Sequence, residues 1–217
     1  MNTKESKTDK DDLWAIFQHL KAVRPSERKF RLFSCYYWEE YAKLGLDWAK
    51  QKRREDLERT TFYTHTISHF KKLIKATWNA KKYADGLIDK ANLVDIAKGW
   101  IVYDESGVSA ASQTIDRAVK DNKPESGRVV NVLGLLEELF GDPLWTAVPS
   151  VEKNWLTPSV IQIATECYAN QDFSGMPILA DALEDAGCED ADILSHCRGR
   201  NEHLRGCWVL DLLLDKE

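Results

Sequence analysis

The chain has 217 residues, of which 43% are hydrophobic and 30% are charged, and its net charge is −5. These values are ordinary for a soluble globular protein with one sizeable core or two small ones. Residues 1–12 are polar and no run approaches the roughly 20 apolar residues that span a bilayer. We therefore expect no signal peptide, no membrane contact, and a cytoplasmic protein whose five cysteines stay reduced.

Apolar residues at helical spacing run along most of the N-terminal half. Residues 11–23 predict one helix, and residues 26–44 predict a second, whose apolar side is a stripe of aromatic side chains. Gly45 follows this stripe as a natural helix terminator. Residues 60–84 predict a third helix. We expect Pro25 in the first turn of the second helix, and residues 46–58 as a further helix or a continuation of it. Gly86 is expected to end the third helix. A short segment follows at 93–103, of which residues 100–103 suit a strand without an evident partner.

The C-terminal half has the pattern of shorter helices separated by glycine and proline. The sequence DNKPESG at 121–127 predicts a flexible connection. Residues 129–140 predict a clearly apolar helix. Thr157 is expected to cap the following helix, because Pro158 suits its first turn. The remaining expectations are a stop at Gly141 and Pro143 and helices at 109–119, 158–169, 176–186, 190–197 and 203–214.

These elements predict an all-α fold, an irregular multi-helix bundle that is either one body or two packed helical subdomains. We expect a basic, aromatic-rich part at 1–120 and an acidic part at 128–217. Residues 21–83 hold 16 Lys and Arg against 7 Asp and Glu, whereas residues 131–217 hold 5 against 16. Such asymmetry indicates an electrostatic partner for one half, unless the two halves face each other within one fold.

Four motifs carry a resemblance to a known family. They are SERKFRLFSCYYWEEYAKL at 26–44, YADGL at 83–87, LEELFGDP at 136–143 and MPILADALEDAGC…DILSHCRGRNEHLRGCWVLDLLL at 176–214. With them the chain resembles a family of mostly helical proteins, common in planctomycete genomes, that has no established function. The chain departs from the family just after Cys35, where aromatic and acidic residues replace a second cluster of cysteines and arginines. The resemblance implies no catalytic residue and no cofactor.

Thiol and imidazole side chains, the ligands that suit tetrahedral zinc, gather near the C-terminal end. His203 and Cys207 are four residues apart, so both point to one side if they lie on a helix. Cys197, which follows His196, precedes the connecting loop and lies within reach of them. The alternative is that the cysteines are small buried apolar residues and that His203 hydrogen-bonds the backbone. The candidate metal ligands are Cys197, His203, Cys207 and, at a greater distance along the chain, Cys188.

Cationic side chains with interleaved aromatic rings are typical of surfaces that bind single-stranded nucleic acid. The basic N-terminal part has this composition, with Trp78 and Tyr83 among its lysines. No helix-turn-helix, RNA-recognition or zinc-finger signature accompanies it. The alternative is a solvated helix face with Trp78 in the core. The candidate nucleic-acid-binding residues are Lys50, Lys52, Arg53, Arg54, Lys71, Lys72, Lys75 and Lys82.

The chain contains no nucleophile elbow, no phosphate loop and no dinucleotide-binding glycine pattern. His65 and His69 have the spacing of a shared metal site, but Thr66 stands where a metalloprotease needs glutamate. We therefore expect no catalytic residue, and no cofactor unless the Cys and His cluster takes zinc.

The leading hypothesis is a non-enzymatic protein-interaction module, an accessory subunit that docks on a partner protein. In it, His203, Arg205 and Trp208 form a structural corner. The alternatives are a nucleic-acid-binding component that uses residues 21–83 and a zinc-stapled module. An enzyme fits only if a metal is present.

Overall fold

The structure is a computed structural model that describes residues 9–23, 26–89, 106–120, 130–142, 149–199 and 202–216. Every regular element in these ranges is a helix, which confirms the all-α prediction. The chain divides into two compact units, Met1–Leu135 and Leu136–Glu217. The boundary falls inside helix α6 (Val132–Phe140), whereas the sequence placed it between residues 120 and 128. None of the described helices is long and apolar enough to cross a bilayer.

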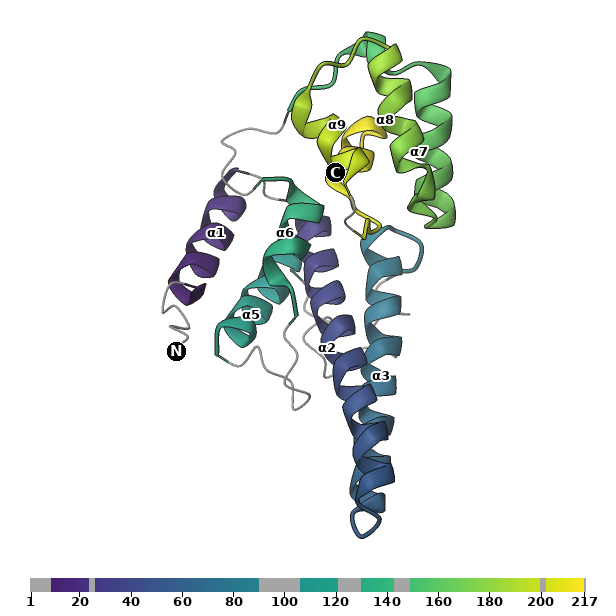
Figure 1. Cartoon of the computed structure of the whole chain (residues 1–217). Helices are drawn as coiled ribbons and strands as arrows, with labels where there is room; N and C mark the ends of the chain where they lie inside the picture. Colours follow the sequence, from purple (N-terminus) through teal and green to yellow (C-terminus); the bar gives the residue numbers. More distant parts are fainter. Residues whose placement is uncertain are drawn as a thin grey trace, which may run out of the picture. The chain divides into compact units, whose positions relative to one another are not determined.

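The N-terminal unit is built on a long antiparallel pair of helices, α2 (Glu27–Glu55) and α3 (Thr60–Ala84), to which shorter helices are added (Figure 1). The shorter helices are α1 (Asp9–Val23) and α5 (Gly107–Lys120). In the C-terminal unit the described elements are the short 3-10 segments Lys153–Trp155 and Phe173–Gly175 and the helices α7 (Pro158–Asn170), α8 (Met176–Asp185), α9 (Ala191–Arg198) and α10 (Trp208–Leu213).

Helix α2 begins at a cap, because the Ser26 side chain accepts a hydrogen bond from the Lys29 backbone N–H at 3.2 Å. The helix then runs through Gly45, so the prediction that Gly45 ends it was wrong. A methyl group at Gly45 would overlap the ring of Phe70 on α3. Gly45 is therefore a site of close helix–helix approach, which periodicity along one helix does not reveal.

Polar contacts join the N-terminal part of α2 to the C-terminal part of α3, and others hold α5 against α2. Arg28 pairs with Asp85 at 2.9 Å, and Lys81 pairs with Glu39. The Trp38 indole N–H donates to Thr114 of α5 at 3.2 Å. The hydrogen bonds from α5 reach Trp38 and Tyr41, in the N-terminal half of α2. The turn between α2 and α3 projects beyond α1 and α5 (Figure 1).

The C-terminal unit packs its helices around an apolar core in which Trp155, Met176 and Leu210 are buried. The predicted cap is present in it, because the Thr157 hydroxyl accepts from the Val160 N–H at 3.3 Å. The Asp190 carboxylate also caps α9, which was not predicted from the sequence. The expected helix at 203–214 was too long, because a turn precedes Trp208 and only α10 is helical. The expectations for Pro25, 93–103, 121–127 and Pro143 lie outside the described residues.

Candidate metal centre

Four side chains that bind metals gather inside the C-terminal unit: Glu138, His196, His203 and Cys207. Each offers one ligand atom, and these atoms all lie within 4.8 Å of one another. Three of the side chains are buried and His196 is partly buried. Four ligand atoms around a tetrahedral zinc ion lie about 3.3–3.8 Å apart, because the bonds are about 2.0–2.3 Å long. The group is therefore close to the size that an ion needs.

The four residues come from three separate parts of the chain. Glu138 lies on α6 and His196 lies in the last turn of α9. His203 and Cys207 lie in the segment between α9 and α10, and Cys207 is the residue that precedes α10. Gly206 has φ of +96°, a conformation that glycine adopts readily, and this turn brings Cys207 back to the group.

Glu138 organises one side of the group. Its Oε1 accepts a hydrogen bond from the Leu204 backbone N–H at 3.0 Å and lies 3.3 Å from Nδ1 of His203. A carboxylate only accepts, so Nδ1 of His203 carries a proton, and in the neutral imidazole Nε2 carries the lone pair. A histidine whose second nitrogen donates to a carboxylate is the common orientation of a metal ligand. His203 is therefore held with a free lone pair inside the protein.

Two polar atoms of the group are buried without a hydrogen-bond partner among the described residues. They are Nε2 of His203 and Oε2 of Glu138. The latter lies 3.6 Å from Nε2 of His196, beyond hydrogen-bonding distance. Leaving a buried polar atom unsatisfied costs about 1–3 kcal/mol, so two such atoms in one group favour the binding of a cation there.

His196 and Cys207 form the other side of the group. The Trp208 indole N–H donates to Nδ1 of His196 at 3.1 Å. Because the indole is only a donor, the neutral imidazole keeps its proton on Nε2. That nitrogen lies 3.1 Å from Sγ of Cys207. In the metal-free protein, Trp208 thus selects the tautomer in which Nε2 of His196 is not free to bind an ion.

Burial sets the protonation of these two side chains. It lowers the pKa of His196 to about 4, and although the Glu138 carboxylate opposes this shift, the imidazole is neutral at neutral pH. Burial also raises the pKa of Cys207 well above its ordinary value, and Glu138 adds to this shift. The metal-free group therefore holds a neutral imidazole and a protonated thiol. A cation would supply the positive charge that allows Cys207 to ionise.

Two of the four metal ligands predicted from the sequence lie together in the structure. His203 and Cys207 belong to the group, although they lie on a turn and not on one helix face as expected. Cys188 and Cys197 are buried in the apolar core, and the group does not include them. Of the two residues that the prediction missed, His196 stood in the same Cys and His cluster. Glu138 carried a weaker signal, as one of two adjacent glutamates in an otherwise apolar helix.

The predicted nucleic-acid-binding residues lie along both helices of the pair, from Lys50 on α2 to Lys82 in the last turn of α3. Those on α2 are largely exposed, and Lys50 and Lys52 pair with Asp47 and Glu55. Trp78 is 54% exposed and thus not in the core. His65 and His69 are exposed on α3, and the metal group of the described residues does not include them. The remaining residues are Arg53, Arg54, Lys71, Lys72 and Lys75, which are exposed, and Lys82, which is partly exposed.

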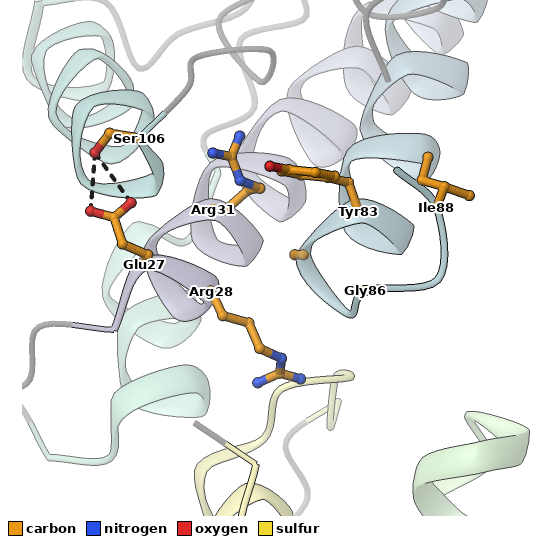
Figure 2. A pocket seen from close by; sticks show the side chains of 8 residues that line it. Glu27, Arg28, Arg31, Tyr83, Gly86, Ile88 and Ser106 are labelled. Atoms are coloured by element: carbon orange, nitrogen blue, oxygen red, sulfur yellow. Dashed lines mark hydrogen bonds between the residues drawn. The ribbon is translucent and has the colours of Figure 1, made fainter. Parts of the chain in front are cut away.

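A cavity of about 560 Å³ in the N-terminal unit is lined by the charged side chains of Glu27, Arg28 and Arg31, each of which already contacts another group of the protein (Figure 2). Glu27 accepts hydrogen bonds from Ser106 and from backbone N–H groups at the start of α5. Arg28 pairs with Asp85, and the Arg31 guanidinium lies 5.1 Å from the centre of the Tyr83 ring. An anion would have to displace these contacts, so the cavity is a weaker candidate than the metal group.

A second cavity, of about 510 Å³, reaches the metal group in the C-terminal unit. His203 contributes to its wall, together with Phe173, Met176 and Leu204. It provides a path from solvent to the edge of the buried group. Comparison of the chain with protein-family models, curated proteins and solved structures found no match.

Proposed function

We propose that the C-terminal unit is a zinc-stapled module in which Glu138, His196, His203 and Cys207 hold one ion. The observation that carries the proposal is the convergence of four ligand atoms within 4.8 Å of one another. Imidazole, thiolate and carboxylate together suit zinc better than magnesium or calcium, which take oxygen ligands. The unpartnered lone pair of His203 supports the same conclusion.

An ion held by four protein side chains has no open position for substrate, as in structural zinc sites. The ion would connect α6, α9 and the turn before α10 and would stabilise their arrangement. Such a role fits a protein that works by binding a partner, so the expected accessory, non-enzymatic role stays part of this proposal. A catalytic role would require one of the four side chains to dissociate from the ion, so that a water molecule could bind in its place.

Metal titration tests this proposal on the full chain, purified without a histidine tag and stripped with a chelator. We expect about one zinc ion per chain, and release of a proton from Cys207 that makes binding tighter as pH rises. Cys207→Ala and His203→Ala should each weaken binding at least tenfold. Cys167→Ala is the matched control, because Cys167 is buried in the same core outside the group. Equal loss in this control, or no zinc uptake by the parent protein, contradicts the proposal.

Trp208 provides a second test, because its hydrogen bond holds His196 in the wrong tautomer for binding through Nε2. Trp208→Phe removes the indole N–H, and a net hydrogen bond of about 1 kcal/mol corresponds to about fivefold tighter zinc binding. Trp155→Phe is the control, since it removes the same atoms from the same core without touching His196. Affinities are compared by competition with a chelating dye. Weaker binding by Trp208→Phe than by Trp155→Phe would contradict this role.

A further inference from the structure

One face of α3 combines lysines with an exposed tryptophan. Lys71, Lys75, Trp78 and Lys82 follow one another at intervals of four, three and four residues, so they lie along one side of the helix. Residues between them, such as Leu73, Ala76 and Ala80, are buried. We call these four residues the α3 stripe. The stripe therefore faces away from the packed side of α3.

No ion pair with a described residue neutralises the lysines of the stripe. Lys71, Lys75 and the neighbouring Lys72 are exposed and make no ion pair with the described part of the chain. By contrast, Lys81 on the packed side pairs with Glu39. Residues 50–82 hold ten Lys and Arg against three Asp and Glu. The surface thus carries a local excess of positive charge that an external anion can neutralise.

Trp78 distinguishes this surface from an ordinary solvated face. Its ring is 54% exposed, and the Lys82 ammonium lies 3.5 Å from the ring centre. The ammonium therefore lies over one face of the half-exposed indole, and a base that stacks on this face has to displace it. A base that stacks on the ring would place its phosphates among Lys71, Lys75 and Lys82. Such stacking needs unpaired bases, which a duplex does not offer.

We infer that the α3 stripe is a binding site for single-stranded nucleic acid. Lysines neutralise the phosphates and supply most of the affinity, without sequence preference. Trp78 supplies base stacking and thereby the preference for single strands over duplex. The site lies in the N-terminal unit and does not depend on the zinc proposal for the C-terminal unit.

Fluorescence anisotropy with a labelled oligothymidylate of about 20 nucleotides tests the inference on the full chain. If Lys71, Lys72, Lys75 and Lys82 each neutralise a phosphate, raising the salt from about 50 to 200 mM should weaken binding about 50-fold. Trp78→Ala should weaken binding about tenfold with little change in salt dependence. The double variant Lys71→Gln, Lys75→Gln should reduce both affinity and salt dependence.

Two control variants separate the stripe from general charge and exposure. Phe62→Ala removes another exposed aromatic ring of α3, roughly 24 Å along the helix from Trp78, and should not change the affinity. Lys43→Gln with Lys153→Gln removes two cations elsewhere and should have little effect.

Three outcomes would overturn the inference: no binding at the lower salt, unchanged binding by Trp78→Ala, or a duplex of equal length that binds as tightly. Polyglutamate of equal charge is the last competitor. If polyglutamate displaces the labelled oligonucleotide as well as unlabelled oligonucleotide of equal charge does, the inference is wrong and the surface is assigned to acidic proteins.

Discussion

Replacing Glu138 with alanine is expected to lower the free energy of unfolding of the metal-free C-terminal unit by about 3 kcal/mol. The substitution leaves two donors without their acceptor, the buried Nδ1–H of His203 and the partly buried Leu204 N–H, and a buried donor without an acceptor costs about 1–3 kcal/mol. Urea unfolding in the presence of a chelator measures the loss. Glu137→Ala is the matched control, because Glu137 is the exposed neighbour on the same helix and should change stability by less than about 0.5 kcal/mol.

Glu138→Gln separates the structural role of this side chain from its role as a ligand. The amide keeps an oxygen that accepts from Leu204 but loses the negative charge that attracts a cation. We therefore expect most of the stability to remain and zinc affinity to fall at least tenfold. Retained affinity in Glu138→Gln would remove Glu138 from the ligand set.

Replacing Gly107 with alanine is expected to destabilise the N-terminal unit by about 3 kcal/mol. The added methyl group would overlap the carbonyl oxygen of Glu27 and lie 3.0 Å from the backbone N of Arg31. Both obstacles are backbone atoms of α2, so the strain is relieved only if α5 moves away, and overpacking of this kind costs about 1–3 kcal/mol or more. The movement would also break the hydrogen bonds between Glu27 and the start of α5.

Gly134→Ala is the control for this prediction. The atoms nearest to a methyl group at Gly134 belong to the Asn131 side chain. This side chain can rotate away at the cost of the cap hydrogen bond that it accepts from the Gly134 N–H, about 1 kcal/mol, and the helix preference of alanine offsets that cost. We expect a change below about 1 kcal/mol by the same unfolding measurement. If Gly107→Ala is as stable as the parent protein, α5 does not approach α2 this closely.

The sequence predicted those helices whose signals are local. Residues 60–84 were predicted with the bounds that α3 has, and Thr157 and Pro158 marked the start of α7. Gly45 was misread because its role depends on Phe70, which reaches it from another helix. The final helix was overextended because apolar periodicity continues across Gly206, where the backbone turns. Local patterns thus predict helices well and miss tertiary exceptions.

The candidate metal group shows the same limit. His203 and Cys207 are four residues apart, and this short spacing was enough to propose them. Glu138 joins them from 65 residues before His203, a separation that periodicity cannot bridge. Cys197 was proposed as a ligand because it lies just before the loop that leads to His203, yet its side chain is buried in the apolar core. Adjacent residues on a helix point in different directions, so the neighbouring His196 lies in the group and Cys197 does not.

X-ray absorption spectroscopy at the zinc edge tests the central claim most directly, because it counts the atoms bound to the ion. The full chain loaded with one equivalent of zinc should show one sulfur at about 2.3 Å and three nitrogen or oxygen atoms at about 2.0–2.1 Å. Cys207→Ala should lose the sulfur, whereas Cys197→Ala should keep it. Two or more sulfurs, or a sulfur that persists in Cys207→Ala, would contradict the ligand set of Glu138, His196, His203 and Cys207.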